Sequence, residues 1–168
     1  MDTRQVKTGQ QLMLSENAYN RVAEILADLS ANTRADVIVF CESNGYPVIH
    51  HGNSKDLDLM AISSLAANNF SATAQMATMV GEKNSFKFLF HEGENTNIYL
   101  SNVGFNFILV VVFSVEVALG MIRVFTNKAI KEINRALKSV KEEEKSEEFV
   151  DLEFKTLLGE ELNRSLKF

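Results

Sequence analysis

An unbroken apolar run, Phe107–Phe113, limits the folds open to this chain more than any other feature. Its β-branched and aromatic residues favour a strand, and a strand that is apolar on both faces must be covered on both. The whole of 95–115 is uncharged, but polar residues such as Asn97 and Asn102 interrupt it. The remaining apolar run is too short to cross a bilayer as a helix. We therefore expect a central strand in a sheet between two helical layers, and no membrane insertion.

Composition fits one globular domain. The chain has 168 residues, of which 46% are hydrophobic and 23% charged. A chain of this length can bury a hydrophobic core without disulfides or structural metals. The lone Cys41 cannot form an internal disulfide, so we expect a reducing, cytoplasmic location. The net charge is −5 and no segment is basic, which argues against nucleic-acid binding. The N-terminal residues contain no apolar stretch of signal-peptide length.

Periodicity predicts three helices and five strands. Apolar residues at helical spacing favour helices over 15–30, 57–80 and about 117–144, and alternation favours strands over 36–42, 46–51, 86–91, 96–102 and 105–115. The order α-β-β-α-β-β-β-α indicates an α/β (α+β) sandwich with a five-stranded antiparallel sheet. Asn44-Gly45 predicts a type I′ turn, and Pro47 places the second strand at a sheet edge.

The C-terminal quarter differs from the rest. We expect the domain to span 14–140 and to be followed by a charged spacer, 141–149. An amphipathic helix over 150–168 would then be free to move relative to the core. Its apolar side is formed by Leu152, Phe154, Leu157, Leu158, Leu162 and Leu166.

Signals for enzymatic chemistry are poor. The sequence contains no phosphate-binding loop, no dinucleotide-binding glycine motif and no zinc-protease motif. Cys41 could meet His50 and His51 across the first hairpin, but a buried structural thiol is the stronger interpretation. Cys41, His50, His51 and His91 do not have the sequence spacing of a metal site. The carboxylates within 92–94 and 142–144 are interpreted as solvent-exposed side chains. We expect no catalytic residues, no cofactor and no metal.

The second predicted helix is unusual because it has no charged residue from Leu59 to Gly81. A surface helix ordinarily carries several charges, so this one should be covered on more than one side. We expect one face to pack on the sheet and the other to be an interface; burial under the C-terminal appendage is the alternative. The sheet face would be Ile62, Leu65, Ala66, Asn69, Met76 and Val80, and the interface Ser63, Ala67, Phe70, Ser71, Ala74 and Thr78.

The predicted strand 86–91 gives a second sign of association. Chain order places it near a sheet edge. Its alternating Phe and Leu residues leave Lys87 as almost the only residue that would discourage another strand from pairing with this edge. Such edges are covered in natural proteins or paired with another copy.

These features together resemble the roadblock/LC7 family, and within it the MglB-type regulators of the Ras-like GTPase MglA. The resemblance covers about 14–140. It is carried by the Asn44-Gly45 hairpin, the helix 64–74 with its ending Val80-Gly81-Glu82, the turn 91–94, the strand 109–113 and Leu119-Gly120.

The resemblance implies a longin-like, profilin-like fold and a homodimer on which the GTPase sits. It implies that GTP hydrolysis is accelerated without an arginine finger, in cell polarity or motility, and that the C-terminal helix contacts a second GTPase surface. The dimer interface would include Phe86, Lys87, Phe88, Leu89, Phe90 and Thr78. The partner-binding surface would include Ser63, Ser64, Ala67, Phe70, Ser71 and Ala74.

Two other functions remain open from the sequence. A dimeric scaffold of the dynein-light-chain or Ragulator type would bind partners without changing GTP turnover. A small-molecule sensor would need a roomy cavity, which the Phe-rich strands disfavour.

Overall fold

The structure is a computed structural model that describes residues 14–165, with side chains described for 14–139 and 154–158. The predicted element order is confirmed, and so is the mixed α/β fold class. The elements are α1 (Glu16–Thr33), β1 (Val37–Glu42), β2 (Pro47–Gly52), α2 (Leu59–Met79), β3 (Phe88–His91), β4 (Thr96–Gly104), β5 (Phe107–Ser114) and α3 (Leu119–Ser165).

The five strands form one antiparallel sheet in the order β2-β1-β5-β4-β3. The apolar run Phe107–Phe113 is indeed the central strand, β5, and Val110 lies between Val39 of β1 and Leu100 of β4. Pro47 begins β2 at one edge, where its missing N–H removes no inner ladder bond. β3 is the opposite edge, as chain order predicted.

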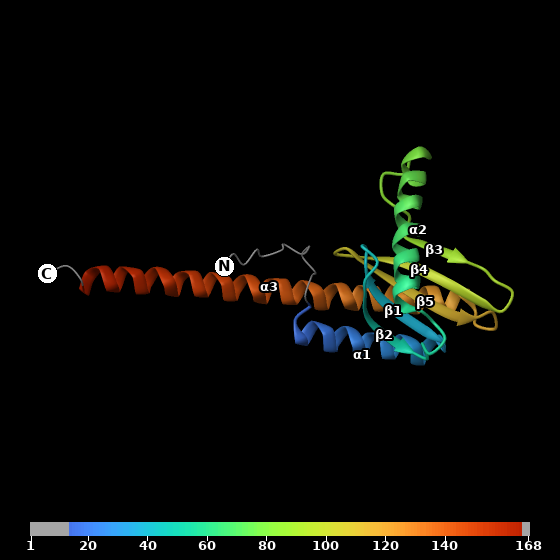
Figure 1. Ribbon diagram of the computed structural model, residues 1–168, viewed down its shortest axis with the longest axis horizontal. Coiled ribbons are helices and arrows are strands. Elements are labelled where there is room, and N and C mark those ends of the chain that lie inside the picture. The colour runs from blue at the N-terminus through green and yellow to red at the C-terminus, as the bar shows by residue number, and fades with distance from the viewer. Residues whose placement is uncertain (1–13, 166–168) are drawn as a thin grey trace, which may run out of the picture.

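Helices cover both faces of the sheet, α1 and α3 on one and α2 on the other (Figure 1). The larger core lies under α1 and α3 and includes Leu26, Phe40 and Ile133. The smaller core lies under α2 and includes Val39 and Phe70. Since α3 packs against the face opposite to α2, it does not bury α2 as the alternative from the sequence required.

Two turns differ from the sequence prediction. The β1–β2 loop is not type I′, because Gly45 has a positive φ of 95° and Asn44 does not. The Glu42 N–H donates to the Tyr46 carbonyl oxygen at 2.8 Å, which closes a three-residue loop over 43–45 with glycine in the left-handed position. The β4–β5 turn lies at Phe105-Asn106, with φ of 53° and 65°, whereas the predicted strands 96–102 and 105–115 would place it at Val103-Gly104. Two consecutive positive φ values give this tight hairpin the type I′ character that was expected at Asn44-Gly45.

The C-terminal region is one continuous helix, which corrects the prediction of two helices joined by a spacer. α3 runs for 47 residues, and its C-terminal part projects beyond the sheet (Figure 1). Glu and Lys are good helix formers, so the charged run 141–149 continues the helix that it was expected to end. Among the described residues no helix is long and apolar enough to span a membrane.

Candidate functional site

The candidate site is the outer side of α2 together with the neighbouring β3 edge. Asp58 caps α2 by accepting a hydrogen bond from the Ala61 N–H at 2.9 Å. One turn later, the Ser64 hydroxyl donates to the Gly45 carbonyl oxygen at 3.4 Å. These contacts fix the N-terminal half of α2 against the β1–β2 loop, while its C-terminal end projects past the sheet (Figure 1).

The sheet-facing side of α2 is not the one that the sequence analysis assigned to the sheet. Ser63, Ala66, Phe70 and Ala77 are buried, and Phe70 belongs to the core beneath α2. Of these only Ala66 was expected to face the sheet. Ser63 and Phe70 were predicted to bind a partner, but both side chains are buried beneath α2 in this chain and do not lie on its exposed side.

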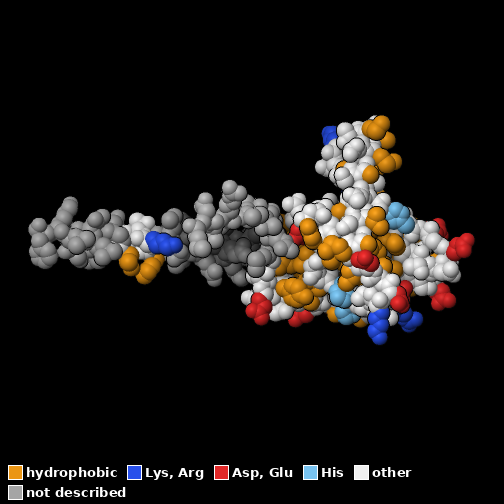
Figure 2. Space-filling model, in the orientation of Figure 1, with side chains coloured by type: hydrophobic (Ala, Val, Ile, Leu, Met, Phe, Trp, Pro, Cys, Tyr) orange, Lys and Arg blue, Asp and Glu red, His pale blue; other side chains and the backbone are white. Residues whose placement is uncertain are grey.

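The side predicted to be core is instead largely exposed. Leu65, Met76 and Val80 are 62%, 57% and 71% exposed, and Asn69 is exposed as well. Figure 2 shows apolar side chains gathered at the projecting end of α2. We define the outer stripe of α2 as its most outward-facing positions, spaced alternately by four and three residues as in a helix–helix seam. These are Ala61, Leu65, Asn68, Ala72, Gln75 and Met79.

Beside this stripe lies a flank of small residues that includes most of the predicted partner-binding positions. Ser71 is exposed, whereas Ser64, Ala67 and Ala74 are half-buried, and Ala67 contacts the core beneath α2. Thr78 is exposed, and its hydroxyl donates to the Ala74 carbonyl oxygen at 3.2 Å. We call the set Ser64, Ala67, Ser71 and Ala74 the small flank.

The β3 edge is aromatic and only partly covered. Phe88, Leu89 and Phe90 are half-buried, as is Phe86 just before the strand, while Lys87 is exposed. Phe88 stacks on Tyr99 with ring centroids 5.1 Å apart. The Arg123 guanidinium of α3 lies 4.9 Å from the centroid of the Phe88 ring. These contacts hold Phe88 against β4 and α3 and leave the outer edge of the strand open.

The backbone of β3 shows which groups are available at the open side. The Asn102 N–H donates to the Lys87 carbonyl oxygen at 3.3 Å, so these residues form a hydrogen-bonded pair. Alternation then directs the N–H and C=O groups of Leu89 and His91 toward β4. Those of Phe88 and Phe90 point outward, where another strand could pair with them.

Cys41 has the properties of a structural thiol. Its side chain is fully buried and donates to the Ile108 carbonyl oxygen at 3.6 Å. Burial raises the pKa of the thiol to about 11, the opposite of what a nucleophile needs. Within the described residues no three His, Cys, Asp or Glu side chains gather to hold a metal ion.

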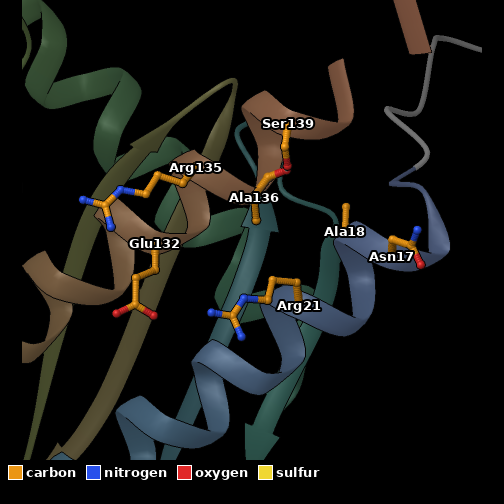
Figure 3. A pocket seen from close by; sticks show the side chains of 7 residues that line it. All are labelled: Asn17, Ala18, Arg21, Glu132, Arg135, Ala136 and Ser139. Atoms are coloured by element: carbon orange, nitrogen blue, oxygen red, sulfur yellow. The ribbon is translucent and has the colours of Figure 1, made fainter. Parts of the chain in front are cut away.

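A groove that the sequence did not suggest lies between α1 and α3, on the other face of the sheet (Figure 3). Its volume is about 680 Å³, and its floor includes the small residues Ala18 and Ala136. Its charged lining residues are Arg21, Arg135 and Glu132, and Arg21 is also paired with Glu24 at 2.9 Å. The groove therefore carries charges of both signs.

The Roadblock/LC7 domain matches residues 20–113. This chain belongs to the Roadblock/LC7 family. MglB from Myxococcus xanthus is similar, with 29% identity, a TM-score of 0.71, and coverage of 76% of this chain and 96% of that one. The gliding protein MglB from Thermus thermophilus shares the fold, with 24% identity, a TM-score of 0.71, and coverage of 79% and 99%.

A structure described as MglB with tetrameric arrangement also shares the fold, with 24% identity and a TM-score of 0.73 over 79% of this chain and 98% of that one. An uncharacterized protein of Aquifex aeolicus is 23% identical over 133 residues, which cover 79% of this chain and 82% of the relative. The chain is an MglB-like roadblock protein.

Proposed function

We propose that this chain is a homodimeric regulator of a small Ras-like GTPase of the MglA type and accelerates GTP hydrolysis without supplying catalytic residues. The observation that carries the proposal is the outer side of α2, which has no charged residue from Leu59 to Gly81 yet exposes Leu65, Met76 and Met79. An exposed apolar surface of this kind marks a protein interface. The similarity to MglB indicates which kind of partner to test.

The proposed homodimer interface combines two neighbouring surfaces, the β3 edge and the outer stripe of α2. In the proposal, β3 pairs with β3 of a second copy through the outward groups of Phe88 and Phe90, which extends the sheet. The outer stripe of α2 meets α2 of that copy, because spacings of four and three residues keep a seam continuous between two helices. The predicted interface residues Phe86, Lys87, Leu89 and Thr78 border these contacts.

The GTPase, in this proposal, binds the small flank of the paired helices. Small side chains let another backbone approach closely, and Ser71 is its most accessible member. α2 has no Arg or Lys, so it cannot place positive charge against the γ-phosphate. Acceleration must instead come from stabilising the hydrolysis-competent state of the GTPase itself.

The test is single-turnover GTP hydrolysis by an MglA-type GTPase with and without this chain. We expect the rate to rise with the concentration of this chain and to saturate. Saturable binding with no change in rate would identify the scaffold alternative and refute GTPase activation.

A further inference from the structure

The projecting part of α3 is an amphipathic helix whose described side chains are uncovered. Leu137 is the last buried side chain described in α3, and the helix continues to Ser165, roughly 40 Å further at 1.5 Å per residue. Phe154, Leu157 and Leu158 are 61%, 64% and 49% exposed and fall at i, i+3, i+4 spacing, so they share one face. Figure 2 shows apolar side chains on this extension, away from the sheet.

The charge sequence of the extension favours one kind of occupant for this face. Residues 141–153 contain seven carboxylates and two lysines, whereas 154–168 contain two carboxylates and three basic residues. A parallel pair of such helices would align one acidic half with the other. An antiparallel pair would set each acidic half beside a half of slightly positive charge, as electrostatic complementarity requires.

We propose that the extension pairs antiparallel with the extension of a second copy of this chain. Since the exposed apolar side chains are centred on Thr156, the two-fold axis lies near that residue. Residues equally far before and after Thr156 are then opposite each other, which sets Phe154 of one copy against Leu158 of the other. By the same register Glu147 lies opposite Ser165. The inference is independent of the proposed function, because it uses neither α2 nor β3.

The first test is the mass of the full chain in solution, measured by light scattering at tens of micromolar. The Phe154→Glu/Leu158→Glu variant should have half the mass of the native chain, because two charges would lie in the apolar contact. Thr156→Glu is the matched control: it adds the same side chain to the same turn but on the opposite side of the helix, so the native mass should persist. Circular dichroism checks that helicity is retained. An unchanged mass for the double variant would overturn the pairing.

Disulfide trapping tests the direction of the pair. Glu147→Cys and Ser165→Cys chains are prepared separately, mixed and oxidised; the native Cys41 is buried and should not react. We expect the mixed disulfide, which joins one chain of each variant, to exceed either homodisulfide at least about tenfold. Preferential joining of two Glu147→Cys chains would indicate a parallel pair and contradict the proposal.

A third comparison separates this contact from the α2 interface. Leu65→Glu should also halve the mass, because it disrupts the proposed α2 interface. Combining it with Phe154→Glu/Leu158→Glu disrupts both interfaces and should give monomers. If only Leu65→Glu changes the mass, the dimer proposal survives and the pairing of α3 fails. If the double variant keeps its mass but loses binding to an MglA-type GTPase, the apolar face of α3 belongs to that partner, and the self-pairing is wrong.

Discussion

Among single residues, Gly45 shows how the fold positions the site. Its φ of +95° places it in the left-handed region, and a Cβ at this position would lie 2.9 Å from the Ser64 Cα of α2. The first hairpin therefore touches α2 backbone to backbone. The sequence pair Asn44-Gly45 correctly indicated a turn, but nothing local showed that the glycine was also needed for close approach to a helix.

Gly45→Ala should destabilise the chain by more than the about 1–2 kcal/mol that a left-handed alanine costs alone. The matched control is Gly81→Ala, at a φ of +81° with nothing within 4 Å of the added Cβ, which should carry the conformational cost only. Urea unfolding measures both differences. Equal losses would show that α2 moves away from the loop without penalty.

Cys41 predicts how stability depends on alkaline pH. Burial raises the pKa of its thiol from 9.0 to about 11, so between those values the unfolded chain loses the proton while the folded chain keeps it. The unfolded state then binds fewer protons, and the free energy of unfolding falls as pH rises from about 9 to 11. Burial raises the pKa of Tyr99 as well, which adds a loss of the same sign.

The contribution of the thiol is isolated by Cys41→Ala. Urea unfolding at pH 8 and pH 11 should show a smaller loss of stability for this variant than for the native chain. The alanine lowers stability by a constant amount through the cavity, but it cannot ionise. Parallel pH profiles for the two chains would mean that the buried thiol does not titrate as described.

Among the elements, α2 marks the limit of prediction from the sequence. Its existence and its end near Gly81 followed from the sequence, but its rotation about its axis did not. Leu65 and Met76 were predicted to pack on the sheet because they are large and apolar. In the structure they are exposed, and Ser63 and Ala66 are buried on the sheet side of the helix. Small residues occur on both sides of the helix, so hydrophobic periodicity could not select a face. Spacings of four and three occur on the small flank as well as on the outer stripe, so spacing alone gave no signal for the orientation of the helix.

The β3 edge was predictable from chain order, and the alternate Phe residues indicated a strand, although the strand begins at Phe88 and not at Phe86. Its backbone gives a test of dimer formation by amide hydrogen exchange. In the monomer the outward N–H groups of Phe88 and Phe90 should exchange fast, whereas those of Leu89 and His91 are protected by β4. In the dimer all four should be protected. Dilution, or the combined Leu65→Glu/Phe154→Glu/Leu158→Glu variant, supplies the monomer. Exchange that is the same in both states would exclude pairing through β3.

At the level of the whole molecule, the domain and its family could be inferred from the order of elements, whereas the reach of α3 could not. A charge run looks like a linker when hydrophobicity alone is considered, but Glu and Lys sustain a helix. The result is a domain with two separate uncovered surfaces, the outer side of α2 and the apolar face of the α3 extension. The first underlies the proposed regulation and the second the proposed pairing, so variants can disable one without the other.

The claim that a GTPase binds the small flank of α2 is tested most directly by affinity for an MglA-type GTPase loaded with a non-hydrolysable GTP analogue. Ser71 is exposed on that flank, and Asn69 is exposed on the opposite side of the same helix. Ser71→Arg should weaken binding at least about tenfold, roughly 1.4 kcal/mol, because a long cation would enter an apolar contact. Asn69→Arg should bind like the native chain. Equal affinities for all three chains would contradict the account.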